Sequence, residues 1–120
     1  TQQKIDQLIN EYFQNKPAGL PGNEDTGVMS AWLIYGMAGF YPITPAEPNY
    51  TFTSPKFTKI TLKRDPQYYP AGDLVIESNA SPENIFIKNI YIDDKPYKSY
   101  FINHEALKNA KKIRFELGKR

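Results

Sequence analysis

The sequence predicts an α+β fold in which two N-terminal helices pack, as a two-layer structure, on an antiparallel β-sheet. Apolar residues recur at helical spacing before residue 41, whereas apolar and polar residues alternate in several segments after residue 45. Prolines at positions 42, 45, 48 and 55 argue against a helix between these two regions. A chain of 120 residues can bury one core and is too short for two full domains. We therefore expect a single domain over residues 1–120, with a helical part at residues 1–41 and a β-rich part at residues 45–120.

The composition excludes several classes of function. A formal net charge of +2, with lysines and arginines scattered among carboxylates, does not favour a nucleic-acid partner. The absence of cysteine excludes disulfides, thiolate metal sites and a cysteine nucleophile, but it does not fix the compartment. No stretch approaches the roughly 20 apolar residues that span a bilayer, so we expect no membrane span. The chain begins at Thr1, and no signal peptide is visible in it.

An amphipathic helix is predicted over residues 2–14. Its apolar side chains follow the i, i+3, i+4, i+7, i+8 spacing that places them on one face: Ile5, Leu8, Ile9, Tyr12 and Phe13. Pro17 and Gly19 end this helix. Because such a stripe is typical of a core-facing surface, we assign it no function beyond packing.

A second helix is predicted over residues 27–38, where almost no polar face remains. A helix that is apolar all round is buried on all sides, so we expect this helix to be the more buried of the two. Trp32 lies within the apolar run, and this position favours a place in the core over the alternative role of a sugar-stacking platform.

The loop at residues 19–27 brings two adjacent carboxylates, Glu24 and Asp25, to the start of the second helix. Pro21 fixes one backbone angle, while the glycines permit conformations closed to other residues. Two interpretations stay open. In the first, Asp25 or Thr26 caps the helix by accepting hydrogen bonds from its free N–H groups. In the second, a carboxylate held by its backbone serves as a catalytic group, and the two roles are compatible.

The β-rich part is predicted to contain six strands, at residues 50–53, 59–63, 74–77, 85–92, 97–101 and 112–117. Asp93 and Asp94 supply a turn, after which the fifth strand pairs back on the fourth. The last strand alternates cleanly and closes the sheet. The spacing of the strands leaves little room for parallel crossovers, so we expect an antiparallel sheet.

A short helix is predicted over residues 104–110, between the last two strands. Asn103 is expected to cap it, and Ala106 and Leu107 are expected to pack inward. His104, the only histidine, lies beside Glu105, but adjacent helical residues point about 100° apart. A solvated turn residue is therefore favoured over a metal ligand.

Two other features also have competing interpretations. The Asn79-Ala-Ser81 triplet fits a glycosylation acceptor, although such triplets arise often by chance. Several tyrosines would form a sugar-binding surface if they shared one exposed face: Tyr68, Tyr69, Tyr91, Tyr97 and Tyr100.

The segment Gly19-Leu-Pro-Gly-Asn-Glu-Asp-Thr-Gly-Val-Met-Ser-Ala-Trp32, followed by Gly39-Phe-Tyr-Pro42 and Ser54-Pro-Lys-Phe57, resembles the C-terminal end of glycoside hydrolase family 92. The likeness extends to the final strand. It implies a fragment of a larger enzyme with an (α/α)-barrel and a β-sandwich, in which the second helix is an inner barrel helix. The family comprises calcium-dependent, exo-acting, inverting α-mannosidases. The resemblance thus implies a mannose-containing glycan as substrate, N-glycan processing, and a secreted, periplasmic or cell-surface location in a bacterium.

The resemblance also implies catalytic residues within Gly22-Asn23-Glu24-Asp25. Inverting glycosidases need a general acid and a general base, and the family's base is the last aspartate of this motif, which is Asp25 here. Glu24 and Asn23 complete the candidate segment. Some members carry aspartate where this chain has Asn23, which can hydrogen-bond but cannot take a proton. The family's general acid is a glutamate far upstream without a counterpart in this chain. Most ligands of its Ca²⁺ should lie upstream too, so we expect calcium in the full-length enzyme without a complete site on this chain.

Two functions remain as alternatives. The first is the C-terminal part of an inverting α-mannosidase, which contributes the general-base loop and is inactive in isolation. The second is a non-catalytic carbohydrate-binding or structural β-rich module. The intact Asn23–Asp25 segment favours the first, since a binding module has no need of it. The first function also implies that the rest of the parent chain covers apolar surface, which would otherwise promote self-association.

Overall fold

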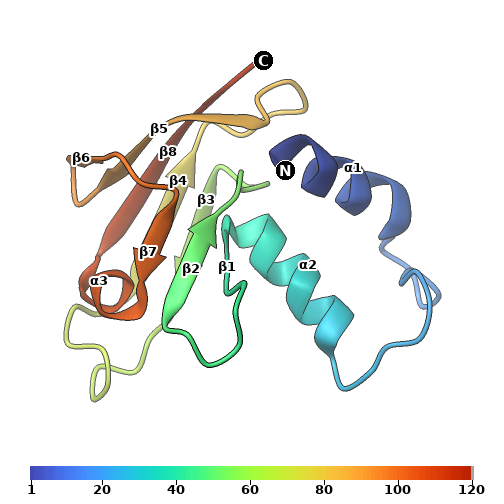
Figure 1. Ribbon diagram of the computed structural model, residues 1–120, viewed down its shortest axis with the longest axis horizontal. Helices are drawn as coiled ribbons and strands as arrows, with labels where there is room; N and C mark the ends of the chain where they lie inside the picture. Colours follow the sequence, from blue (N-terminus) through green and yellow to red (C-terminus); the bar gives the residue numbers. More distant parts are fainter. Residues whose placement is uncertain (120) are drawn as a thin grey trace.

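The computed structural model describes residues 1–119, and Figure 1 shows two long helices beside a group of strands. The helices are α1 (Gln2–Tyr12), α2 (Val28–Ala38) and α3 (His104–Asn109). The strands are β1 (Phe40–Tyr41), β2 (Asn49–Phe52), β3 (Lys59–Leu62), β4 (Leu74–Ser78), β5 (Phe86–Ile92), β6 (Lys95–Tyr97), β7 (Phe101–Asn103) and β8 (Lys112–Gly118). The predicted helices are present, and β1 is an additional short strand directly after α2.

The strands form two sheets, whereas the sequence predicted one. The smaller sheet has the order β1-β2-β7 and the larger has the order β3-β4-β8-β5-β6. The α+β class is confirmed. The fully antiparallel arrangement is wrong, because β4 and β8 pair in parallel, with Ile76 opposite Ile113. The connection between these two strands contains β5, β6, β7 and α3, and a parallel pair needs a connection of this length.

β8 lies in the middle of the larger sheet and does not close its edge. It pairs with β4 on one side and antiparallel with β5 on the other. Its side chains alternate strictly between the two faces, and Ile113, Phe115 and Leu117 are buried. The predicted alternation of this strand is therefore correct, and only its place in the sheet differs.

The strand predicted at residues 97–101 is wrong for the most part: Tyr97 ends β6, Phe101 begins β7, and residues 98–100 between them form neither helix nor strand. β6 turns back onto β5, with Tyr97 opposite Ile90. The chain then leaves the larger sheet, and β7 pairs with β2, with Ile102 opposite Tyr50. The Tyr97 hydroxyl donates to the carbonyl of Phe101 at 2.6 Å, which bridges the point where the chain changes sheets.

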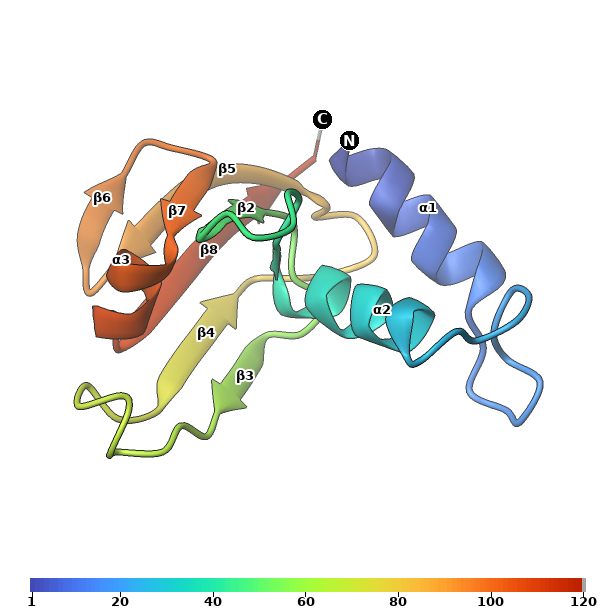
Figure 2. The same ribbon diagram turned by 60° about the horizontal axis from the view of Figure 1, so that its bottom comes forward.

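The hydrophobic core contains side chains from both sheets and from α3, and Figure 2 shows the smaller sheet lying against the larger one. Phe52 of the smaller sheet meets Phe115 of the larger sheet edge-on, with 5.5 Å between ring centroids. Asn103 caps α3 as predicted, because its side chain accepts the Ala106 N–H at 2.9 Å. Leu107 is buried as expected, but Ala106 is exposed.

The two long helices contact each other at Gly36 of α2. A Cβ at this position would lie 3.4 Å from Ile9 Cδ1 of α1, so the missing side chain allows the close approach. Fewer residues of α2 than of α1 are exposed, which agrees with the prediction. However, α2 is not buried on all sides, since Val28 and Ile34 are 61% and 65% exposed. No other element of residues 1–119 covers this face.

The turn between β5 and β6 also fixes the start of β8. Asp93 and Asp94 both have positive φ, 49° and 65°, as in a type I′ turn, which matches the twist of a hairpin. The Asp93 carboxylate accepts the N–H groups of Lys111 and Lys112, each at 3.0 Å. Asp93 therefore links the hairpin of β5 and β6 to the start of β8.

We expect Asp93→Ala to destabilise the fold more than Asp94→Ala does. Both variants lose a residue that tolerates positive φ, but only the first loses the hydrogen bonds to Lys111 and to Lys112, where β8 begins. The difference between their free energies of unfolding should be about 1 kcal/mol, the usual net value of exposed hydrogen bonds. Urea unfolding of the two variants measures it. Equal destabilisation would show that the carboxylate does not support β8.

Candidate active site

The chain between α1 and α2 is shaped by a close backbone approach at Gly19. A Cβ on Gly19 would lie 1.8 Å from the carbonyl oxygen of Gln14, so no other residue fits there. The Gln14 N–H donates to the Gly19 carbonyl, and the Gly19 N–H donates to the Lys16 carbonyl, both at 2.9 Å. This closed loop fixes where the chain leaves α1 and where the segment with the candidate residues starts.

A tight turn connects the candidate residues to α2. The Val28 N–H donates to the Asp25 carbonyl at 3.1 Å across Thr26 and Gly27, whose φ angles are 52° and 82°. Two positive φ angles in sequence are typical of a type I′ turn. The Thr26 hydroxyl donates to the same carbonyl at 2.8 Å. The backbone of Asp25 is thus held by two hydrogen bonds at one oxygen.

Glu24, and not Asp25 or Thr26, supplies a side-chain acceptor to the first turn of α2. Its Oε1 accepts the N–H of Ser30 at 3.1 Å. The residue at the N-cap position is Gly27, which has no side chain to act as a cap. The longer side chain of Glu24 supplies the missing acceptor, and its negative charge is also favourable at the positive end of the helix dipole. The predicted capping role therefore belongs to a neighbouring residue.

The three candidate residues lie together on the surface, but their side chains differ in their contacts. Asn23, Glu24 and Asp25 are all exposed. Within residues 1–119, no group donates to the Asp25 carboxylate, whereas the Glu24 carboxylate is bonded to the helix. The arrangement presents one carboxylate to solvent on a fixed backbone. Such a carboxylate has oxygen atoms that can accept hydrogen bonds from water.

Trp32 of α2 packs against the other helix. Its ring stacks on Phe13 with 5.6 Å between centroids and 17° between planes, and its side chain is half-buried. This contact agrees with the predicted packing role. It also fixes the angle between α1 and α2 close to the candidate loop.

The tyrosines do not share one exposed face. Tyr97 packs edge-on against Phe52 on the core side of the larger sheet. The ring of Tyr91, on the other side of that sheet, is covered by the Arg114 guanidinium at 4.0 Å from its centroid. Tyr68 and Tyr100 are exposed but belong to separate loops. The sugar-binding surface considered from the sequence is therefore not assembled in this chain.

His104 is half-buried and bonded, in contrast to the solvated turn residue predicted. Its Nδ1 lies 3.1 Å from the Tyr50 hydroxyl, and its backbone N–H donates to the Pro48 carbonyl. Burial is the main cause that raises the pKa of Tyr50, and the nearby Tyr35 and Tyr69 raise it further. The pair joins α3 to the smaller sheet.

Asn79 of the possible glycosylation triplet is bonded to the central strand. Its Nδ2 donates to the Leu117 carbonyl at 2.9 Å, and its Oδ1 accepts the Leu117 N–H at 2.7 Å. The amide nitrogen to which a glycan would be attached is thus engaged in the folded chain. The Asn79 side chain therefore forms hydrogen bonds with the backbone of β8 one residue beyond the end of β4.

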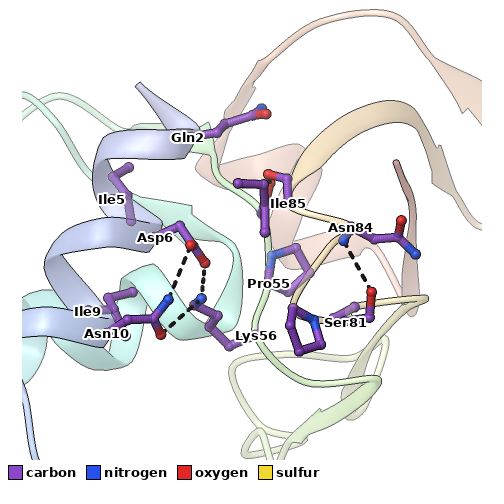
Figure 3. A pocket seen from close by; sticks show the side chains of 13 residues that line it. Gln2, Ile5, Asp6, Ile9, Asn10, Pro55, Lys56, Ser81, Asn84 and Ile85 are labelled. Carbon is purple, nitrogen blue, oxygen red and sulfur yellow. Dashed lines mark hydrogen bonds and ion pairs between the residues drawn. The ribbon is translucent and has the colours of Figure 1, made fainter. Parts of the chain in front are cut away.

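A cavity of about 330 Å³, lined by both polar and apolar side chains, lies between α1 and the segments at residues 54–56 and 80–85 (Figure 3). The Lys56 ammonium on its wall contacts the carboxylate of Asp6 in α1 and lies 3.5 Å from Asn10 Oδ1. Asn10 in turn donates to Asp6 at 3.1 Å. These three side chains satisfy one another, so the cluster ties α1 to the segment that follows β2.

Residues 1–119 match the family model described as the glycosyl hydrolase family 92 catalytic domain. The chain belongs to glycoside hydrolase family 92. The family 92 resemblance found in the sequence is thus confirmed over the whole length that the structure describes.

Known members share the fold of this family 92 chain. It superimposes with a TM-score of 0.89 at 28% identity on a family GH92 alpha-mannosidase from Bacteroides thetaiotaomicron solved in complex with mannoimidazole, covering 99% of this chain and 15% of that one. A family GH92 inverting mannosidase from the same bacterium gives a TM-score of 0.83 at 24% identity, covering 99% and 16%, a likeness that shows the fold alone. An uncharacterized secreted glycosidase from Arthroderma benhamiae is 27% identical over 111 residues, 92% of this chain and 14% of the relative. The chain therefore spans about a seventh of the length of these relatives.

None of the helices in residues 1–119 is both long and apolar enough to cross a membrane.

We expect Lys56→Met to destabilise this family 92 chain by about 1–3 kcal/mol, between the values for surface and buried ion pairs. The substitution leaves the largely buried Asp6 carboxylate without its cation. Lys59→Met, at an exposed strand position, serves as the matched control and should change stability little. Thermal unfolding of both variants provides the measurement, and equal melting temperatures would contradict a role for the cluster.

Proposed function

We propose that this chain contributes the general-base loop to an inverting α-mannosidase that hydrolyses terminal α-mannosides of glycans. The observation that carries the proposal is the Asp25 carboxylate, which is exposed and without a partner in residues 1–119 while its backbone is fixed. The likeness at 28% identity to an alpha-mannosidase supports the choice of substrate. The family to which the chain belongs supports the reaction class.

In the proposed reaction, Asp25 removes a proton from a water molecule as the water oxygen attacks the anomeric carbon. The new C–O bond forms on the face opposite the leaving group, so the configuration is inverted. The bond to the leaving oxygen breaks, and this oxygen takes a proton from a general acid outside this chain. Inverting enzymes keep the two carboxyl groups about 6.5–9.5 Å apart to leave room for the water. Asn23, two residues before the base, can hydrogen-bond this water but cannot share the proton.

The proposal includes Ca²⁺ in the complete enzyme, as the family implies. Within residues 1–119, no group of three or more histidine, aspartate or glutamate side chains is placed to hold a metal ion. We propose that most of the calcium ligands lie in the rest of the enzyme, and no step above is assigned to the ion.

We further propose that the rest of the parent chain covers the apolar surface of this one. The exposed face of α2 carries Val28 and Ile34, and an apolar cavity of about 390 Å³ lies beside Trp32 between the helices and the smaller sheet. Ile43 and Phe101, each 61% exposed, stand at the rim of this cavity. Uncovered apolar surface of this kind promotes self-association of an isolated chain.

A secreted, periplasmic or cell-surface location, and a role in N-glycan processing, belong to the same proposal. The relative from Arthroderma benhamiae, named a secreted glycosidase, supports the first of these. The alternative function, a carbohydrate-binding module, is not favoured, because the tyrosines that it requires are divided between faces and loops.

Asp25→Asn tests the catalytic assignment in the complete enzyme. Because no group in residues 1–119 donates to this carboxylate, the substitution should leave the free energy of unfolding nearly unchanged. Asparagine cannot take a proton from water near neutral pH, so kcat should fall by roughly a hundredfold or more, as for a positioned acid–base group. Asp94→Asn, at a turn position that suits asparagine, is the matched control. Full activity in Asp25→Asn would end the assignment.

The 120-residue chain by itself should have no hydrolase activity, because it lacks the acid partner of Asp25. Incubation of the purified chain with an α-mannoside, and detection of released mannose, measures this directly. A heat-denatured sample of the same chain sets the background. Turnover above that background would show that the two-carboxylate geometry is complete within these residues.

A further inference from the structure

We propose that Glu24 is a positioning residue for Asp25. Its carboxylate attaches the candidate segment to the first turn of α2, and this attachment leaves the carboxylate of Asp25 available for catalysis. The inference rests on the function proposed for Asp25. It gives Glu24 a role distinct from that of a proton carrier.

The first support is the bond between Glu24 and α2. Oε1 of Glu24 accepts the Ser30 N–H at 3.1 Å, and this N–H belongs to the first turn, where the helix itself supplies no acceptor. The same oxygen lies 3.9 Å from the place of a Cβ on Gly27. The side chain therefore folds back over the turn and lies against the helix end, which makes it an unsuitable base for a water in front of the loop.

The second support is the backbone between Glu24 and the helix. Thr26, a β-branched residue, has a φ of 52°, a value that such residues rarely adopt. The Asp25 carbonyl accepts the Val28 N–H and the Thr26 hydroxyl, and these two bonds close the turn. The Glu24 carboxylate supplies a separate attachment to α2, because it binds the Ser30 N–H from the residue just before Asp25. Without Glu24, the unfavourable conformation of Thr26 is free to relax, and Asp25 moves with it.

The bond from Ser30 to Glu24 and the unfavourable backbone conformation of Thr26 together explain why the two adjacent carboxylates have different contacts. A hydrogen bond from the helix to Asp25 would reduce its ability to accept a proton. A bond to Glu24 provides the same connection to α2 at a residue that the reaction does not need. The long side chain reaches Ser30 across Gly27, and the short side chain of Asp25 points to solvent.

Activity of the complete enzyme with Glu24→Gln and Glu24→Ala is the first test. Glutamine keeps an oxygen acceptor of the same reach, so Glu24→Gln should retain kcat within about fivefold. Glu24→Ala should lower kcat by about 10–100-fold with KM nearly unchanged, because misplacement of a catalytic group by about 1 Å has an effect of this size. Equal inactivity of both variants would overturn the inference, since it would assign a proton-transfer role to Glu24. Full activity of Glu24→Ala would also overturn it.

The second test uses the 120-residue chain and needs no activity. The amide hydrogen of Ser30 should exchange with solvent more slowly in the native chain than in Glu24→Ala, because Glu24 accepts its hydrogen bond. Glu24→Gln keeps an oxygen acceptor and should retain most of this protection. Equal exchange rates in the native chain and in Glu24→Ala would show that the bond is not formed. Retained activity in Asp25→Asn, in contrast, would refute the function of Asp25 while the Ser30 result still stood.

Discussion

The joint between the end of α2 and the segment after β2 sets the position of the helical part relative to the sheets. The Thr53 N–H donates to the Gly39 carbonyl and the Lys56 N–H donates to the Met37 carbonyl, both at 2.9 Å. The hydroxyl of Thr53, a residue only 3% exposed, donates to the Gly36 carbonyl. Gly39 has a φ of 100°, and a Cβ there would lie 3.2 Å from both the Pro55 side chain and the Thr53 carbonyl, so the joint favours glycine at this position. Because α2 is a continuous helix, this joint also determines the position of the loop at residues 19–27, which precedes its N-terminus.

The elements that the sequence predicted well are those with a local signal. Apolar residues in α1 repeat with the helical period, and the side chains of β8 alternate between two faces. The parallel pairing of β4 with β8 has no such signal, since it depends on strands brought together by everything between them. The division of residues 97–101 between two sheets is also non-local. Only the two ends of the segment, Tyr97 and Phe101, lie in strands, and these strands pair with β5 and β2, which are distant in the chain or belong to different sheets.

The candidate site shows a similar limit at the level of side chains. The sequence placed two carboxylates and a threonine before α2, and short side chains are the usual caps of helices. The structure gives the N-cap position to Gly27, and the longer Glu24 then reaches the free N–H of Ser30. Glu24 can take the place of Asp25 or Thr26 as the acceptor only because the turn has two positive φ angles, and the residue types alone do not specify these angles. The catalytic role proposed for Asp25 rests on the resemblance to a family, whereas the structure shows that no group in residues 1–119 donates a hydrogen bond to its carboxylate.

The central position of β8 has a consequence for the order in which the chain can fold. β3 and β4 form one pair and β5 and β6 form another, and both pairs precede β8 in the chain. During synthesis these hairpins are complete before the strand that joins them has been made. Each would then expose an unpaired edge on its inner side, a feature that favours aggregation in folding intermediates. The larger sheet, and the bond from Asn79 to Leu117, can form only once β8 has been made. Chaperone dependence of this chain should therefore be greatest just before β8 is released.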